Sequence, residues 1–311
     1  MNDFAAFLIL ALGIIGTGIS LATPYLYASI GETFVQLSGV YNLGVDGIML
    51  MGAFSGFYVV LRTGNLWLGL LTAAIVGALM GLIMAVISVT LKAEQGISGI
   101  GLQLFGLGLS SLLFKVMVGS PQPITGFQPV PIPLLSEIPY IGEIFFNQNI
   151  LVYFAFLLVP IATFILNKTT FGLKVRAAGQ NPMAADSLGV NINRIRYTTL
   201  LIGGVLAGIA GATLSIAWVN LFQENMTNGM GFIAVALVYF GGWRPVGVMG
   251  GALLFSLVNA FQFTVQLNKN IAIPYDVLVM LPYILTILAL AFARRTQTPA
   301  ALSKPFERGE N

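Results

Sequence analysis

The sequence contains no cysteine and no histidine, and these two absences remove much of enzyme chemistry. Without thiols or imidazoles the chain cannot form disulfides, use a thiolate nucleophile or an imidazole base, or build the usual zinc sites. Charged residues are also scarce, at 8% of 311 residues, whereas a soluble domain carries about 25%. No recognisable pairing of a nucleophile with a base remains, so we expect a chain that is not an enzyme and that binds no metal or cofactor of its own.

Apolar residues take the place of charge. They make up 57% of the chain, and the mean hydropathy is +0.90. No soluble fold could bury that much apolar surface, so the composition predicts an all-α integral membrane protein in which residues 1–311 form a single transmembrane domain. The net charge of +3 does not indicate nucleic-acid binding, because the basic residues lie at the ends of apolar runs, where they orient a chain against membrane lipid.

About ten segments are apolar enough to cross or enter a bilayer, because roughly 20 residues span its hydrocarbon core. They are Phe4–Ala22, Pro24–Ser38, Val45–Val60, Leu66–Leu91, Ile97–Val118, Ile150–Leu166, Tyr197–Trp218, Gly229–Phe240, Val246–Gln266 and Tyr275–Phe292. The second, third and eighth are short, and each borders a glycine cluster, 39–47 or 241–251. Non-helical backbone at membrane depth requires surrounding protein or a water-filled cavity, so we expect these three segments to line the interior.

The basic residues set the expected orientation. If both termini are cytoplasmic, all but three of the fourteen basic residues, Arg62, Lys115 and Lys269, lie on the inside. This bias predicts a multi-pass protein of the cytoplasmic (inner) membrane with a cytoplasmic loop at 167–196 and a cytoplasmic tail at 293–311. The proline-rich segment 119–149 is then the long external loop.

Glycine pairs four residues apart predict close helix packing. There are 36 glycines, and the pairs Gly77/Gly81, Gly204/Gly208 and Gly247/Gly251 each lie on one helical face. Small residues at this spacing let two helices approach closely, as is usual in membrane proteins.

Polar side chains within the apolar segments mark candidate positions for a permeation path. Ser29, Glu32, Thr33 and Gln36 form one helical stripe, Ser256, Asn259, Gln262 and Gln266 form another, and Gln103 is isolated. Our candidates for the substrate pathway are Glu32, Gln36, Gln103, Asn259 and Gln262. Amides and hydroxyls suit a neutral hydroxylated or base-containing solute, because they replace its hydration without burying a net charge. The alternative is structural: hydrogen bonds between helices, or Glu32 capping the broken backbone near Gly39.

The polar interruption 168–196 contains a short helix with signals at both ends. Asn181 suits the N-cap, Pro182 suits the first helical position, and Gly189 can take the left-handed conformation that ends a helix. A self-capped helix on a basic loop outside the bilayer is suited to bind another protein.

Two motifs carry a family resemblance. Met183-Ala184-Ala185-Asp186-Ser187-Leu188-Gly189 resembles the cytoplasmic coupling motif of ABC-importer permeases, with Met183 in place of the motif's glutamate. Residues 172–182 and 38–49 look like the permeases of branched-chain amino acid and simple-sugar systems. Overall the chain is most similar to the branch associated with purine nucleosides and basic-membrane-protein-type lipoproteins.

The resemblance implies the permease subunit of an ATP-driven ABC importer for a small polar solute, above all a nucleoside or simple sugar. No lysine follows a glycine, so the phosphate-binding loop of an ATPase is absent and ATP is expected to be used by a separate cytoplasmic ATPase. That ATPase would dock on Asn181, Pro182, Met183, Ala184, Ala185, Asp186, Ser187, Leu188 and Gly189. A second permease subunit, identical or different, would complete the pore, and an extracytoplasmic solute-binding protein or lipoprotein would deliver the solute.

Other functions stay open on the sequence alone. An ion-coupled secondary transporter would use Glu32 or Asp46 as its coupling carboxylate. Within the family, a permease for branched-chain amino acids or another small solute is the alternative. An intramembrane enzyme is disfavoured because histidine is absent.

Overall fold

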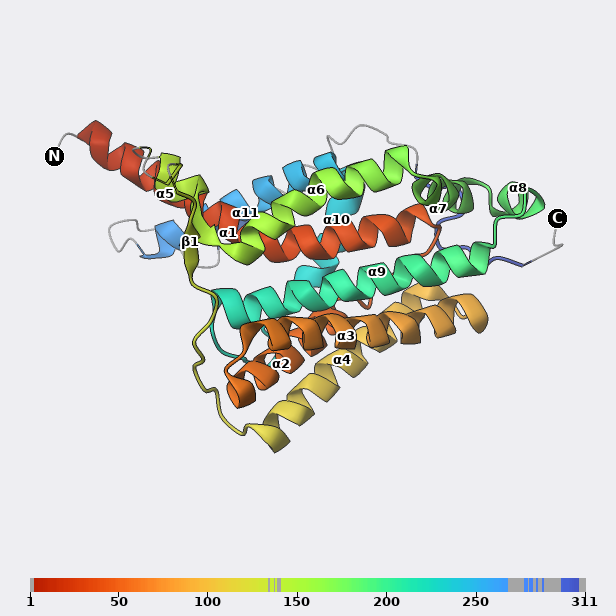
Figure 1. The fold of residues 1–311 in the computed structure, drawn as a ribbon, viewed down its shortest axis with the longest axis horizontal. Coiled ribbons are helices and arrows are strands. Elements are labelled where there is room, and N and C mark those ends of the chain that lie inside the picture. Colours follow the sequence, from red (N-terminus) through yellow and green to blue (C-terminus); the bar gives the residue numbers. More distant parts are fainter. Residues whose placement is uncertain are drawn as a thin grey trace.

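The computed structural model describes residues 3–133, 135–136, 138, 141–267, 277–278, 280–281, 284, 287 and 298–307. In these residues the predicted all-α class is confirmed, and seven helices are long and apolar enough to cross a membrane (Figure 1). The helices are α1 (Asp3–Leu37), α2 (Val45–Thr63), α3 (Leu66–Ala85), α4 (Gln95–Met117), α5 (Ile141–Phe145), α6 (Ile150–Lys168), α7 (Thr170–Gln180), α8 (Pro182–Ser187), α9 (Ile192–Thr213), α10 (Met230–Phe240) and α11 (Pro245–Leu267). Short π-helical turns extend α3 (Val86–Thr90) and α9 (Leu214–Trp218), and β1 (Pro129–Pro131) pairs antiparallel with β2 (Asn147–Asn149). The predicted segment Tyr275–Phe292 lies mostly outside the described residues.

Side-chain caps explain where several helices begin. The amide oxygens of Asn65, Asn149 and Asn191 accept backbone N–H groups at the starts of α3, α6 and α9. At the start of α4 the carboxylate of Glu94 does the same, and the N–H groups of Ile97 and Gly96 lower its pKa. Each cap satisfies donors that the first helical turn leaves unpaired.

Helix α1 corrects the predicted topology. Phe4–Ala22 and Pro24–Ser38 are not two segments but one continuous helix with Pro24 inside it. The proline removes only one hydrogen bond, and neighbouring helices hold the chain on both sides of it. One crossing in place of two puts the start of α1 and residues 298–307 at opposite ends of the bundle (Figure 1). This arrangement is at odds with the expectation that both termini are cytoplasmic. We name the two ends by the elements found there, the β1 end and the α8 end.

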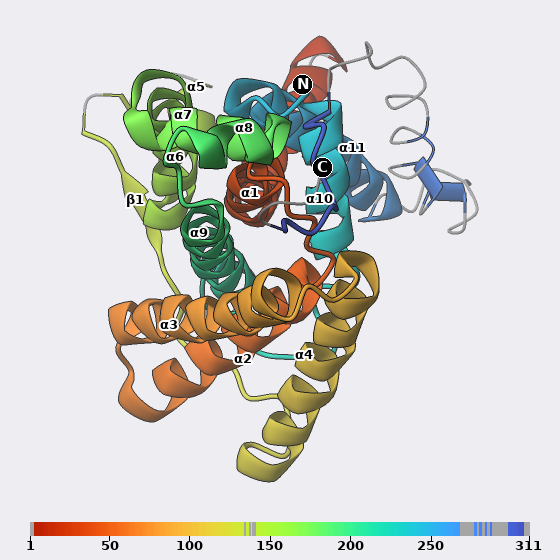
Figure 2. The same ribbon diagram turned by 90° about the vertical axis from the view of Figure 1, so that its right-hand side faces the viewer.

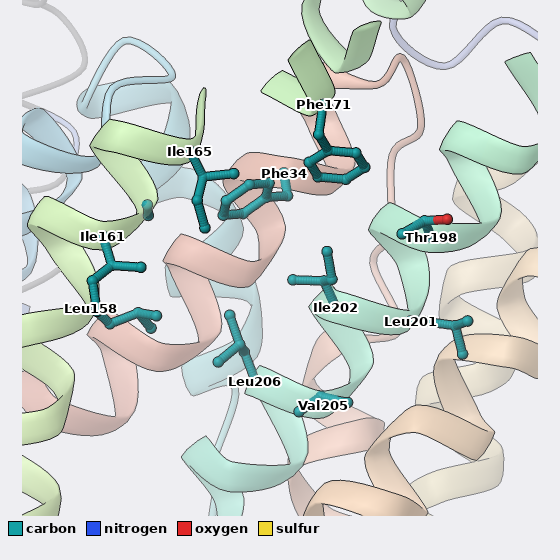
Figure 3. Close-up of a pocket in the computed structure, with 11 residues that line it drawn as sticks. Phe34, Leu158, Ile161, Ile165, Phe171, Thr198, Leu201, Ile202, Val205 and Leu206 are labelled. Atoms are coloured by element: carbon teal, nitrogen blue, oxygen red, sulfur yellow. The ribbon is translucent and has the colours of Figure 1, made fainter. Parts of the chain in front are cut away.

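The helices surround α1. It packs against α9, α11, α10 and α6, while α2, α3 and α4 form a second group beyond α9 (Figures 1 and 2). The outer surfaces of α3, α4 and α6 expose large apolar side chains such as Leu79, Ile97 and Phe164. Between α6 and α9, over α1, the surface is hollowed into an apolar groove (Figure 3). Helices with such surfaces require a hydrocarbon environment.

The glycine pairs lie at close helix contacts, as predicted. A Cβ atom on Gly77 would lie 2.2 Å from the Gly204 carbonyl oxygen, and one on Gly208 would lie 2.2 Å from the Ala73 carbonyl oxygen. On α11, a Cβ on Gly247 would lie 2.2 Å from the Gly241 carbonyl oxygen. Only hydrogen fits between these backbones.

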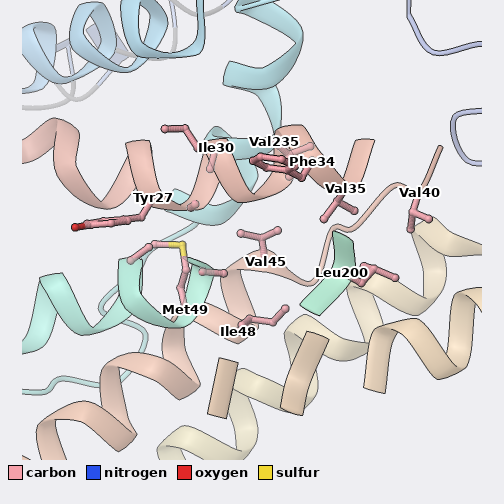
Figure 4. Packing of buried hydrophobic residues seen from close by; sticks show 14 of the residues in the cluster. Tyr27, Ile30, Phe34, Val35, Val40, Val45, Ile48, Met49, Leu200 and Val235 are labelled. Atoms are coloured by element: carbon pink, nitrogen blue, oxygen red, sulfur yellow. The ribbon is translucent and has the colours of Figure 1, made fainter. Parts of the chain in front are cut away.

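The main core fills the space between α1, α2, α9 and α10. The cluster includes Tyr27, Ile30 and Phe34 of α1, Met49 of α2 and Val235 of α10, and Figure 4 shows Tyr27 beside Met49. Because lipid is as apolar as these side chains, close packing rather than exclusion from water holds them together. This core positions the irregular segments described next.

Candidate functional site

Residues 38–44, between α1 and α2, are non-helical and mostly buried by protein. The Tyr41 N–H donates to the Gln95 side-chain oxygen at 2.8 Å, and a Cβ on Gly99 would lie 2.7 Å from the Leu43 nitrogen. A Cβ on Gly47 would lie 2.6 Å from the Gln103 Cα. The segment and the first turn of α2 therefore run alongside α4 over about two helical turns, from Gln95 to Gln103. The expectation of broken backbone enclosed by protein is confirmed for this segment.

The N-terminal ends of α2 and α10 meet at Asp46. Its buried carboxylate accepts the Gly231 N–H at 2.9 Å, and the Gln103 side chain bonds to the same carboxylate. A Cβ on Gly231 would lie 2.3 Å from the Asp46 nitrogen, so the two helix starts are in direct contact. A carboxylate is stabilised at a helix start, because the first N–H groups of a helix have no partner within the helix. Asp46 thus joins two helix starts inside the bundle.

Glu32 and Gln36 form a second polar group, nearer the α8 end. One Glu32 oxygen accepts from the Asn42 N–H at 3.3 Å and from the Gln36 amide at 3.4 Å, while its Oε2 has no partner among the described residues. The Gln36 oxygen accepts the Trp243 indole N–H at 2.9 Å. Glu32 therefore bonds to the broken backbone, as the structural alternative expected. Nothing in the sequence pattern indicated a role for Trp243 beyond its place in a glycine cluster.

Asn259 and Gln262 lie apart from both groups. On α11, Phe255 stacks edge-on against Tyr25 with ring centroids 5.2 Å apart, and Leu257 approaches Gly18. Since Glu32 is seven residues beyond Tyr25 on α1, the amide stripe lies roughly 10 Å or more from it toward the β1 end. The five pathway candidates therefore occupy three places: Glu32 with Gln36, Gln103 with Asp46, and Asn259 with Gln262.

A polar pocket of about 260 Å³ opens at the β1 end. Its lining combines hydroxyl and amide side chains from α1, the β1–β2 region and the end of α9. They include Ser20, Thr23, Gln128, Asn147, Gln148 and Asn220. The Ser20 hydroxyl donates to the Gln148 side-chain oxygen at 2.6 Å. Sequence reasoning missed this pocket because its residues come from four separate stretches of chain.

At the α8 end, the predicted short helix is present with both of its signals. The Asn181 side-chain oxygen accepts the Ala184 N–H at 3.0 Å, and Gly189 has φ +84°. Ala185 is buried against the bundle, whereas Met183 and Leu188 are exposed, Leu188 to 85%. An apolar side chain held outward on a capped helix is suited to a protein partner.

Arg196 forms hydrogen bonds that connect several segments at this end of the bundle. Its position among the basic residues of the loop did not indicate this role. The side chain is buried on α9, and its Nε and Nη1 donate to the Ser38 and Lys304 carbonyl oxygens at 3.3 and 3.0 Å. The chain end adds two backbone bonds, from Ala301 N–H to the Gly179 oxygen and from Ser303 N–H to the Gly39 oxygen. Residues 298–307 are therefore not a free tail. Their hydrogen bonds connect them to α7, α9 and the segment 38–44.

Comparison with known proteins gives these features a context. The family described as "Branched-chain amino acid transport system / permease component" matches residues 14–290. The chain belongs to this family of transport permeases. The predicted resemblance and the permease function are thus confirmed, and the ion-coupled alternative gains no support.

Three relatives align over most of both chains. The putative glucose ABC transporter permease protein TsgC13 of Haloferax volcanii is 37% identical over 96% of this chain and 98% of its own. The guanosine ABC transporter permease protein NupQ of Bacillus subtilis is 36% identical over 93% and 94%. The nucleoside ABC transporter permease protein NupC of Lactococcus lactis is 39% identical over 87% and 88%. No solved structure matches the chain.

Proposed function

We propose that this permease imports a nucleoside or a simple sugar as part of an ATP-driven complex. The observation that carries the proposal is similarity at 36–39% identity, over most of each chain, to permeases named for guanosine, nucleosides and glucose. The hydroxyl and amide lining of the pocket at the β1 end supports it, because such groups replace the hydration of a neutral polar solute.

The α8 end faces the cytoplasm in this proposal. Among the described residues, the basic side chains at the α8 end outnumber those toward the opposite end of the bundle, Arg62 and Lys115. They include Lys92, Lys168, Lys174, Arg176, Arg194, Arg196 and Lys304. Positive charge concentrates on the cytoplasmic side of membrane proteins. With this orientation the single helix α1 puts the N-terminus outside, and the polar pocket opens to the outside as well.

A separate cytoplasmic ATPase supplies the energy by docking on residues 181–189, where Met183 and Leu188 are exposed. A second permease subunit completes the pore, and an external solute-binding protein or lipoprotein delivers the solute to the β1 end. When the ATPase moves α8, the start of α9 moves with it, and Arg196 transmits the motion to the Ser38 carbonyl. The broken segment 38–44 and the helix starts at Asp46 then change the accessibility of the path between the two sides.

The test is uptake by the whole complex reconstituted in vesicles with its ATPase and binding protein. We expect ATP-dependent uptake of guanosine or glucose, and none driven by a proton gradient without ATP. Uptake of leucine in place of both would contradict the substrate class. Uptake that follows the proton gradient and ignores ATP would contradict the energy source.

A further inference from the structure

The apolar groove between α6 and α9 has a cavity volume of about 630 Å³ (Figure 3). Leu158, Ile161 and Ile165 line one wall, Ile202 and Leu206 line the other, and Phe34 of α1 forms the floor. The one hydroxyl in the lining, on Thr198, is already bonded to the Arg194 carbonyl oxygen at 2.8 Å. The groove therefore offers no hydrogen bond to a ligand and suits hydrocarbon.

The groove is open to the bilayer. Both of its walls, α6 and α9, are candidate membrane spans, and Ile161 at its edge is 44% exposed. Its volume is within the range of about 300–1,000 Å³ that is typical of ligand pockets. An acyl chain from the surrounding lipid can enter without crossing water.

Three cations lie beyond one end of this groove. Lys168 follows the lining residue Ile165 by three positions, Lys174 follows Phe171 by three, and Arg194 precedes Thr198 by four. Helical spacing puts each cation on the same face as its lining residue, with Lys168 and Arg194 one turn nearer the α8 end and Lys174 on α7, which lies at that end. All three are exposed. The ion pairs found in the described parts of the chain are Lys92–Glu307 and Lys115–Glu224, and neither uses these cations.

We propose that this groove is a binding site for an anionic phospholipid of the cytoplasmic leaflet. One acyl chain fills the groove, and Lys168, Lys174 and Arg194 contact the phosphate and headgroup. Three helices each contribute one cation to the same end of a wholly apolar channel, which matches a molecule with one charged end and a hydrocarbon body. The leaflet assignment rests on the orientation given under the proposed function, whereas lipid binding does not.

Such a lipid would brace the coupling region. Lys168 ends α6, Lys174 lies on α7, and Arg194 begins α9, so these three positions flank the coupling helix on both sides along the chain. A bound headgroup holds the three helices at a fixed spacing. We therefore expect anionic lipid to raise the coupling of ATP hydrolysis to uptake.

The test measures retained lipid in the purified permease complex after exchange into mixtures of phosphatidylglycerol and phosphatidylcholine. We expect the wild type to retain phosphatidylglycerol preferentially. Removing the cations as Lys168→Gln, Lys174→Gln and Arg194→Gln should lower that affinity about fivefold for each. A charge-matched control, Lys115→Gln with Arg62→Gln and Lys304→Gln, should leave it unchanged. Ile202→Trp, which fills the groove and keeps the cations, should also lower retention.

Three results would overturn the proposal. One is equal retention of the two lipids by the wild type, and another is equal loss in the cation variants and the charge-matched control. The third is a high-yield crosslink from a cysteine at Ile161 to the second permease subunit, which would show that protein covers the groove. Because retained lipid is measured without solute or ATP, failure here is distinguishable from failure of the transport proposal.

Discussion

The crossing of α3 and α9 allows a quantitative test of the packing. A Cβ atom on Gly77 would lie 2.2 Å from the Gly204 carbonyl oxygen and 2.9 Å from the Gly208 Cα. Both are backbone atoms, so no side chain can rotate away, and the helices must separate by about 0.8 Å to restore a tolerable contact. Overpacking of this kind costs about 1–3 kcal/mol. The higher helix propensity of alanine offsets about 1 kcal/mol, so we expect Gly77→Ala to lose about 0–2 kcal/mol of stability.

The matched control is Gly108→Ala on α4, where a Cβ would meet no heavy atom within 4 Å. This variant should be as stable as the wild type or slightly more stable. The measurement is the unfolding midpoint of each purified protein in the same detergent. A Gly77→Ala protein as stable as the Gly108→Ala protein would refute the close approach of α3 and α9. Gly77→Val should lower the midpoint further, because the added methyl groups point into the same backbone.

Three further predictions concern transport and membrane orientation. Gly189→Val should abolish most ATP-coupled uptake while membrane abundance stays normal, because a β-branched residue is strained at φ +84°; unchanged uptake counts against coupling through α8. A cysteine at Gln128 should react with an impermeant thiol reagent added outside, and one at Ser187 only in opened cells; the reverse pattern would invert the orientation. Asn259→Leu should lower uptake about fivefold, as the loss of one hydrogen bond implies, while Glu32→Gln keeps substantial uptake at matched expression. Loss only in Glu32→Gln would favour ion coupling.

Local patterns in the sequence were enough to predict most of the helices. The apolar run Leu66–Leu91 became α3 with its π-helical extension, and Ile150–Leu166 became most of α6. Asn181 and Gly189 bound a short helix because capping depends on neighbouring residues alone. The prediction failed at Pro24. Proline usually breaks a helix, but packing of other helices around α1 stabilises a continuous helix through it.

The functional geometry was less predictable, because it depends on contacts between distant residues. Asp46 and Gly231 are separated by 185 positions, and Arg196 and Ser38 by 158. No periodicity or motif encodes such pairs. The polar stripes were found, since spacing reveals a helical face, but spacing does not say which stripes meet. The buried Arg196 was counted as a topological charge because basic residues in loops are usually exposed.

These long-range contacts give the proposed coupling a physical route. Arg196 lies just inside α9, whose first residues follow directly from the coupling helix. Its hydrogen bonds to Ser38 and Lys304 are directional, so a shift of α9 by even about 1 Å must break them or move their partners. The partner that can move is the segment 38–44, which is not helical and whose backbone bonds to α1 involve only residues 38–40 among its described N–H groups. That segment ends where Asp46 joins the starts of α2 and α10. In the proposed coupling, motion delivered there would pivot α2 and α10 about their starts, which costs less free energy than bending a continuous helix such as α1.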